Sequence, residues 1–141
     1  MFTKLDLRWE YKNVRIKEGD KWKVAFIIPE ELFEPTVMFF GLTNSPAIFQ
    51  AIINEFLKDL INMGKMGSFI NDVIVGTESK ERHNELVKEI LRRIKENNLY
   101  IKLKKCKWKV REVDFLEVII GLEEIKNKKE ESESSVRLAS F

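Results

Sequence analysis

One stretch constrains the fold of this chain more than any other: Gly67 to Gly76, which reads Gly-Ser-Phe-Ile-Asn-Asp-Val-Ile-Val-Gly. Two short apolar runs, rich in β-branched residues, flank the polar pair Asn71-Asp72. Because Asn and Asp tolerate tight-turn backbone angles, the pattern predicts a β-hairpin that turns at this pair. A hairpin tip holds a polar side chain at a fixed point, as a metal or catalytic group requires. Taken alone, however, the pair is sufficiently explained as turn chemistry.

Helical patterns lie on both sides of this hairpin. Ser45-Pro46 predicts a helix start with Ser45 as the cap, and apolar residues then recur at helical spacing until Gly64. After the hairpin, Ser79 predicts the cap of a second amphipathic helix that ends at Asn97-Asn98. Its buried stripe is expected to be Leu86, Ile90, Leu91 and Ile94.

Shorter patterns predict strands. Residues 2–7 alternate apolar and polar side chains. Further strands are predicted at residues 23–28, 32–40, 100–103, 107–110 and 113–120, with a turn at residues 29–31. The order strand, helix, hairpin, helix, strand predicts an α+β fold of the split βαβ (ferredoxin-like) kind, an antiparallel sheet backed by two helices.

Composition sets the broad class. The 141 residues suit one domain, with a net charge of +2 that neither demands nor opposes a nucleic-acid partner. The single cysteine, Cys106, excludes an internal disulfide, and no apolar run is long enough to span a membrane. We therefore expect an intracellular protein with no membrane partner. The only histidine, His83, lies among charged residues on a predicted solvated helix face, which argues against a triad built on it.

Two aspartates are expected to converge. Asp6 lies at the end of the first predicted strand, and Asp72 lies at the hairpin tip. In a split βαβ sheet the first strand commonly lies beside the hairpin, so the two carboxylates are expected to meet. Carboxylates at strand ends suit Mg²⁺, which prefers oxygen ligands and is often shared with substrate phosphates.

Three segments carry a resemblance. Residues 2–11 read Phe-Thr-Lys-Leu-Asp-Leu-Arg-Trp-Glu-Tyr, residues 37–50 read Val-Met-Phe-Phe-Gly-Leu-Thr-Asn-Ser-Pro-Ala-Ile-Phe-Gln, and residues 69–72 read Phe-Ile-Asn-Asp. In this order they closely resemble successive motifs of reverse transcriptases, most of all the gypsy type of LTR retrotransposon. The similarity continues through residues 98–108 and 113–121. The resemblance implies a reverse-transcriptase palm over residues 1–121, followed by a charged tail, residues 122–141, that is expected to be disordered.

The resemblance also implies roles for individual residues. Asp6, Asn71 and Asp72 match the three catalytic aspartates that hold two Mg²⁺ ions (Mn²⁺ is the alternative), and the Leu7 carbonyl matches a further metal ligand. The implied nucleotide-binding residues are Trp9, Glu10, Tyr11, Phe40 and Gln50, of which Tyr11 matches the aromatic residue under the deoxyribose. Leu116 and Glu117 match a turn that positions the primer end. For Lys102 and Lys105, near a later lysine-bearing motif, a plain solvated strand edge is the alternative.

Several positions depart from the family pattern, with milder consequences expected at Pro35 and Phe39 than at the three described next. Asn71 stands where a second metal-bridging carboxylate belongs, which removes a charge next to the ions. Glu10 adds a negative charge close to a triphosphate, and Glu117 replaces a glycine in the primer-positioning turn. We expect these changes to impair the reaction severely.

The implied function is therefore a retrotransposon reverse-transcriptase fragment whose ancestral activity is RNA-directed DNA synthesis. Its implied partners are an RNA or DNA template-primer, deoxynucleotide triphosphates and other segments of a retrotransposon polyprotein. Fingers and thumb segments are expected to be missing, so binding to template-primer should be weak. Two alternatives stay open: a non-catalytic nucleic-acid-binding or protein-interaction module, and a relic with no function.

Overall fold

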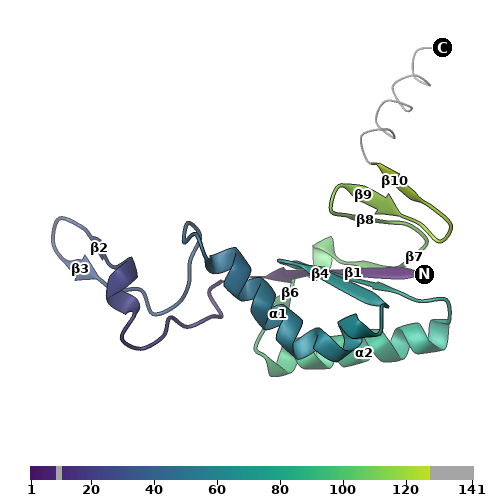
Figure 1. Ribbon diagram of the computed structural model, residues 1–141, viewed down its shortest axis with the longest axis horizontal. Coiled ribbons are helices and arrows are strands. Elements are labelled where there is room, and N and C mark those ends of the chain that lie inside the picture. Colours follow the sequence, from purple (N-terminus) through teal and green to yellow (C-terminus); the bar gives the residue numbers. More distant parts are fainter. Residues whose placement is uncertain (9–10, 128–141) are drawn as a thin grey trace, which may run out of the picture.

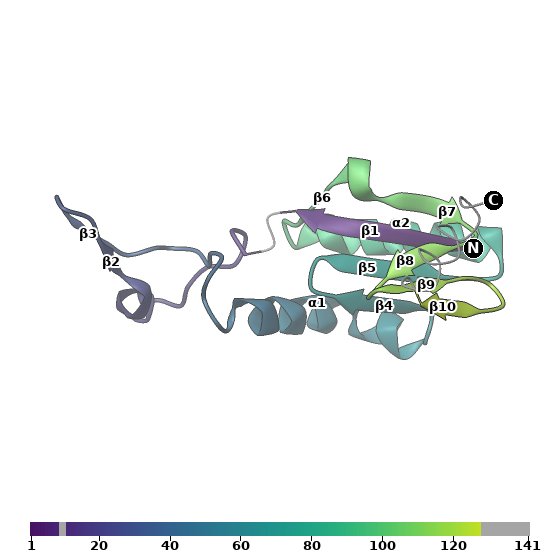
Figure 2. The ribbon, with the colours of Figure 1, turned by 90° about the horizontal axis from the view of Figure 1, so that it is seen from above.

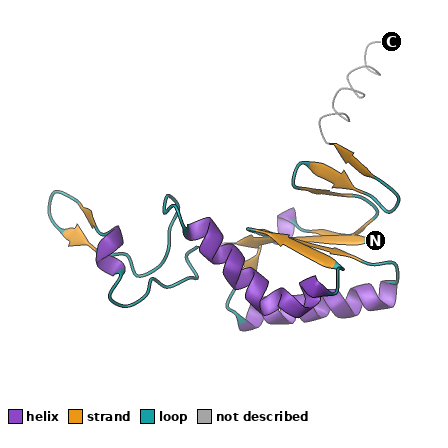
Figure 3. Cartoon of the chain, in the orientation of Figure 1, coloured by secondary structure: helices purple, strands orange, loops and turns teal. Residues whose placement is uncertain are grey.

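The computed structural model describes residues 1–8 and 11–127, and every structural statement below refers to these residues. Figure 1 shows a sheet with two long helices on one side and a small second sheet on the other. The elements, coloured by type in Figure 3, are β1 (Phe2–Arg8), η1 (Lys21–Val24), β2 (Phe26–Ile27), β3 (Leu32–Phe33), α1 (Ser45–Asn62), β4 (Met66–Phe69), β5 (Asp72–Gly76), α2 (Lys80–Glu96), β6 (Tyr100–Ile101), η2 (Leu103–Lys105), β7 (Lys107–Val110), β8 (Val113–Phe115), β9 (Val118–Ile120) and β10 (Ile125–Asn127).

The main sheet is antiparallel, with the strand order β4-β5-β1-β6, and β7 also pairs with β1. This central place of β1, between the hairpin and the later strands, is visible from above in Figure 2. The predicted α+β fold, an antiparallel sheet backed by two helices, is therefore confirmed. A separate sheet, β10-β9-β8, adds strands beyond this core.

The core forms between the sheet and the helices because one face of each strand is apolar. Leu5 and Leu7 of β1 and Val73 and Val75 of β5 are buried at 0% exposure. The helices contribute the buried side chains Phe49, Ile53, Leu57, Ile90 and Ile94. Period-two alternation then places Lys4 and Asp6 on the face of β1 away from the helices, which is called the open face below because no helix covers it. The apolar pattern of the strand thus decides where its polar side chains lie.

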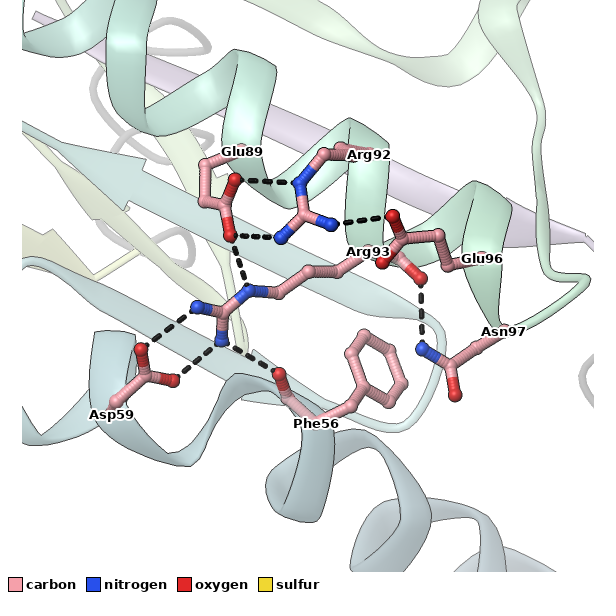
Figure 4. Close-up of polar contacts among 7 residues, drawn as sticks. All are labelled: Phe56, Asp59, Glu89, Arg92, Arg93, Glu96 and Asn97. Atoms are coloured by element: carbon pink, nitrogen blue, oxygen red, sulfur yellow. Dashed lines mark hydrogen bonds and ion pairs between the residues drawn. The ribbon is translucent and has the colours of Figure 1, made fainter.

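An arginine joins the two helices (Figure 4). The guanidinium of Arg93 in α2 donates to the Phe56 carbonyl at 2.9 Å and to the Asp59 carboxylate at 2.8 Å, both in α1. Its Nε donates to Glu89 one turn earlier at 2.7 Å. The hydrogen bond from Arg93 lowers the pKa of Asp59 to about 2. Because these bonds reach carboxylate and backbone oxygens together, they fix the crossing of α1 and α2 as well as their separation.

His83 is buried, so the predicted solvated position is wrong. Its Nε2 lies 2.7 Å from the hydroxyl of Thr3 in β1, and its Nδ1 lies 2.8 Å from the hydroxyl of Thr77. Thr77 already donates its hydroxyl proton to the Ser79 carbonyl, so it accepts from Nδ1–H, and Thr3 donates to Nε2. Burial lowers the pKa of His83. The buried imidazole therefore ties the start of α2 to the sheet.

Several predicted boundaries also need correction. The hairpin turns at Ile70-Asn71, one residue earlier than predicted, and Asp72 is the first residue of β5. Ser45 does not cap α1: it is the first helical residue, and Asn44 holds the cap position without a side-chain hydrogen bond. Ser79 does cap α2, accepting from the Arg82 amide at 3.4 Å.

The strand predicted at residues 107–110 is confirmed as β7 (Lys107–Val110), whereas several other strands are shorter than the sequence predicted. Only two residues each of β2 and β3 pair, although the predicted turn between them forms through reciprocal hydrogen bonds of Ile28 and Glu31. Residues 100–103 form a two-residue strand followed by η2, and residues 113–120 form the hairpin of β8 and β9 rather than one strand. Within the predicted tail, β10 pairs with β9, and residues 128–141 lie outside the described part of the chain.

Residues 11–44 extend away from the sheet (Figures 1 and 2). This segment buries few apolar side chains, and its exposed large ones are Trp22, Phe26, Ile27, Ile28, Leu32, Phe33 and Phe40. Across the described residues, no helix has the length and apolar character needed to cross a membrane.

Candidate metal and nucleotide site

The predicted convergence of Asp6 and Asp72 rests on the register of β1 and β5, which places these residues directly opposite each other. The Leu7 amide donates to the Asn71 carbonyl at 2.7 Å, so the neighbouring Asp6–Asp72 pair is of the non-hydrogen-bonded kind. Side chains approach most closely in such pairs, whose Cα atoms are about 4.5 Å apart. Both carboxylates therefore lie side by side on the open face of the sheet.

The backbone and one oxygen of Asp6 are held from the other side of β1. Its carbonyl accepts from the Lys102 amide at 2.7 Å, and its amide donates to Cys106 Sγ at 3.5 Å. Its Oδ1 is buried without a hydrogen bond, because the nearest cation, Lys102 Nζ, is 3.6 Å away. Burial raises the pKa of the Cys106 thiol beside it. A carboxyl oxygen is thus held in place with unused capacity to accept.

Lys4 lies on the same face and bridges two carboxylates. Its Nζ is 3.1 Å from Asp72 Oδ2 and 3.4 Å from Asp114 Oδ2 in β8, and Lys107 donates to Asp114 Oδ1 at 2.6 Å. Burial opposes the charge of Lys4, but the hydrogen bond and charge of Asp72, followed by those of Asp114, raise its pKa. The hydrogen bond from Lys107 lowers the pKa of Asp114 to about 2. Like charges opposite each other are costly in a sheet, so Lys4 offsets the Asp6–Asp72 repulsion through its contact with Asp72.

The sequence interpretation passed over Lys4. Its position two residues before Asp6 on an alternating strand was the available signal, since residues i and i+2 share a face.

The hairpin tip itself has an unusual backbone. Ile70 has a φ of 52°, and Asn71 does not share this positive angle, which is the pattern of a type II′ turn. That first position favours glycine, so a β-branched residue there is strained. Gln50 in α1 holds the strained turn: its Oε1 accepts from the Ile70 amide, and its Nε2 donates to Ser68 Oγ at 3.0 Å. Both polar ends of Gln50 are therefore engaged with the hairpin.

The other predicted nucleotide-binding residues divide into two groups. Tyr11 is buried, with its ring 4.8 Å from that of Phe40 and 6.0 Å from that of Phe49, both edge to face. Phe40 is 74% exposed and covers Tyr11 from outside. Trp9 and Glu10 lie outside the described residues.

The predicted primer-positioning pair forms the turn between β8 and β9. Leu116 and Glu117 have φ values of 49° and 64°, and Phe115 pairs with Val118, so this is a two-residue turn of type I′. Such turns favour Asn-Gly, which gives the departure at Glu117 a conformational cost.

The donor set fits a divalent cation of the Mg²⁺ class. Carboxylate oxygens are its preferred ligands, and Asp6 Oδ1 is a buried one that lacks a hydrogen bond. No group of three or more His, Cys, Asp and Glu residues is placed to hold a metal ion anywhere in residues 1–8 and 11–127. Asp6 and Asp72 would therefore be the ionic ligands of such a cation, and Asn71 precedes Asp72 in the turn.

Comparison with known proteins supports one family. The model of the family described as reverse transcriptase (RNA-dependent DNA polymerase) matches residues 1–120. The Transposon Tf2-3 and Tf2-7 polyproteins of Schizosaccharomyces pombe are each 34% identical over 116 residues, which is 82% of this chain. The chain spans only 9% of the length of these relatives.

Solved structures agree at the level of the fold. A foamy viral protease–reverse transcriptase in complex with RNA/DNA hybrid matches with a TM-score of 0.81 and 23% identity over 94% of this chain and 18% of that one. A second, in complex with double-stranded DNA, matches with a TM-score of 0.81 and 22% identity over 94% and 23%. With the fold, the paired aspartates and a family model that covers most of its length in agreement, this chain belongs to the reverse transcriptase family, as a domain of retrotransposon type.

Proposed function

We propose that the chain is the palm of a gypsy-type retrotransposon reverse transcriptase whose ancestral reaction, RNA-directed DNA synthesis by two-metal nucleotidyl transfer, is severely impaired here. The observation that carries the proposal is the pairing of Asp6 with Asp72 on the open face of the sheet, with Asn71 in the turn beside them. The substrates would be a template-primer and deoxynucleotide triphosphates. Within a polyprotein, other segments would cover the remaining faces of the palm.

Asp6 and Asp72 would hold Mg²⁺ or Mn²⁺, with the Leu7 carbonyl as a further ligand. When bound, the ions supply activation of the primer hydroxyl and neutralisation of phosphate charge. The protein contributes rigidity: Asp6 is anchored through its own amide and carbonyl, and Gln50 fixes the hairpin that carries Asp72. The carboxylates are therefore pre-positioned rather than drawn together by the ions.

The nucleotide would lie beyond the carboxylates, toward Tyr11 and Phe40. Exposed Phe40 offers an apolar surface for packing against a base or sugar, and it is supported from behind by Tyr11. In this proposal Tyr11 excludes a ribose 2′-hydroxyl by its bulk, and the backbone N–H groups of Trp9 and Glu10 would bind the triphosphate. Leu116 and Glu117 would contact the primer end.

Asn71 accounts for the impairment. A unit charge about 4 Å from a divalent ion is worth roughly 8 kcal/mol gross at an effective dielectric near 20. If about 3 kcal/mol of that survives desolvation in the transition state, the rate falls more than a hundredfold. The amide keeps the shape of the turn but not its charge, so the fold persists while the chemistry declines.

The test compares the chain with Asn71→Asp and Asp6→Ala. Manganese binding is followed by electron paramagnetic resonance, and primer extension is measured on an RNA template with Mg²⁺ or Mn²⁺. We expect Asn71→Asp to tighten Mn²⁺ binding and raise extension, and Asp6→Ala to abolish both. Asp6-dependent extension by the unmodified chain at the rate of Asn71→Asp would overturn the proposed impairment.

A non-catalytic role in binding nucleic acid is the second candidate, and one surface favours it. Exposed lysines gather along η2 and β7, next to the partly exposed Trp108, and they are Lys104, Lys105, Lys107 and Lys109. Cations beside an aromatic ring suit contacts with backbone phosphates and bases. Salt-dependent binding to RNA–DNA hybrid that survives Asp6→Ala but not Lys104→Gln/Lys105→Gln would support it. Unaltered binding in the lysine double variant would count against it.

A further inference from the structure

Lys4 has a complete set of acceptors divided between two elements. Its side chain is 13% exposed, and its Nζ donates to the Asp114 carbonyl at 3.0 Å and lies within reach of Asp72 Oδ2 and Asp114 Oδ2. An ammonium group has three protons, so these three oxygens use all of them. One oxygen belongs to the candidate metal site in β5, and two belong to β8, in the hairpin that turns at Leu116 and Glu117.

We propose that Lys4 is an internal counter-cation of the metal site, a positioning residue that holds Asp72 when no divalent ion is bound and passes to Asp114 when one binds. The inference rests on the proposed function, because it takes Asp72 as a metal ligand. In consequence, metal occupancy is coupled to the attachment of the β8–β9 hairpin.

Charge makes the transfer necessary. A divalent ion on Asp72 would compete with the Lys4 ammonium for the same oxygen and would repel it across a short distance. A site without any cation is also unfavourable, because the carboxylates of Asp6 and Asp72 then face each other across a non-hydrogen-bonded pair. Lys4 satisfies Asp72 in that state, while Lys102 lies 3.6 Å from Asp6.

Geometry makes the transfer short. Two of the three Lys4 contacts are already to Asp114, so leaving Asp72 requires rotation about the flexible stem rather than movement of the strand. Asp114 is itself fixed by Lys107 in β7. Release of Lys4 from Asp72 therefore concentrates its charge on β8 and strengthens the attachment of that hairpin to β1.

The experiment measures Mn²⁺ affinity of the full chain by paramagnetic resonance. We expect Lys4→Met, which keeps the apolar stem, to bind Mn²⁺ about tenfold or more tightly than the unmodified chain, as loss of a close competing charge predicts. Asp114→Asn should bind it several-fold more weakly, because Lys4 then has no second carboxylate. Lys4→Gln, which keeps a donor without the charge, should behave as Lys4→Met does if each variant retains its circular dichroism.

A double-mutant cycle distinguishes the transfer of Lys4 between carboxylates from a general electrostatic effect of removing charges. If Lys4 is the link, Asp114→Asn has no effect on Mn²⁺ affinity in the Lys4→Met background, whereas additive effects would overturn the proposal. Amide exchange in β9 should also slow on adding Mn²⁺ to the unmodified chain and not to Lys4→Met. Asp6-dependent Mn²⁺ binding that ignores Lys4→Met refutes this inference alone. Absence of Asp6-dependent binding in every variant refutes the metal site and the inference together.

Discussion

Gln50 provides the sharpest test of how the candidate site is held. Its Oε1 accepts from the Ile70 amide and its Nε2 donates to Ser68, so one side chain satisfies two groups of the hairpin. Gln50→Leu replaces the amide group with an apolar side chain of comparable bulk and leaves the half-buried Ile70 amide without its acceptor. Gln50→Glu is the matched control, because it keeps the acceptor and loses only the donor.

The magnitude follows from the group left unsatisfied. An amide deprived of its partner costs about 1–3 kcal/mol, and the positive φ of Ile70 adds strain that the bond now offsets. We expect Gln50→Leu to destabilise the fold by about 2 kcal/mol, a fall in melting temperature of roughly 6–10 °C for a domain of this size. Gln50→Glu should cost less than half as much, since the Ile70 amide keeps its acceptor and only the Nε2 contacts to Ser68 and Asn54 are lost.

Calorimetry and native-state hydrogen exchange provide the assay. Exchange at the Ile70 amide should accelerate in Gln50→Leu and stay protected in Gln50→Glu. An unchanged melting temperature together with unchanged exchange at Ile70 in Gln50→Leu would refute the view that this side chain holds the turn.

Three further predictions test features away from the carboxylates. Arg93→Lys should lower the urea midpoint of unfolding with little change in slope, because an ammonium cannot replace the forked bonds between α1 and α2. The control Arg92→Lys, whose ion pairs lie within one helix, should have a midpoint close to that of the unmodified chain. Equal midpoints for the two variants would contradict the role of Arg93 in joining the helices. Glu117→Gly should stabilise the chain by about 1 kcal/mol, since glycine adopts positive φ without strain, and a loss of stability would disprove the turn assignment. Because the pKa of His83 is lowered in the folded chain, its contribution to stability is complete above the ordinary histidine pKa of 6.5 and is lost progressively as the pH falls below that value. The urea midpoint should therefore drop between about pH 7 and about pH 5 in the unmodified chain but not in His83→Gln. Parallel pH profiles of the two proteins would rule out this contribution of His83.

The layers of the fold could be predicted because local patterns specify them. The spacing of Phe49, Ile53 and Leu60 predicts α1, and the alternation of residues 2–7 predicts β1, without knowledge of any partner. The pairing of Asp6 with Asp72 followed from topology, since the first strand of this arrangement lies beside the hairpin. Features set by residue periodicity and by the order of the elements could therefore be predicted from the sequence.

Features that depend on contacts between residues far apart in the sequence could not be predicted. His83 has charged neighbours in sequence and was predicted to be solvated, but Thr3, 80 residues away, supplies the hydroxyl that makes its burial favourable. Lys4 escaped notice for the same reason, because Asp114 belongs to a hairpin whose position no local pattern specifies. The predicted position of the turn was wrong by one residue. The β-branched Ile70 takes a positive φ that its side chain disfavours and that the hydrogen bond to Gln50 stabilises.

The two-residue turn at Ile70-Asn71 has a consequence for how such a chain can change over time. Because Asp72 faces Asp6 through strand parity, inserting or deleting one residue in the turn would move Asp72 to the helix side of the sheet and Val73 into water. A change such as Asp to Asn at position 71 disturbs no pairing and exposes no core. Decay of a coding sequence under selection for folding alone would therefore erase charges at this turn long before it altered the length of the turn.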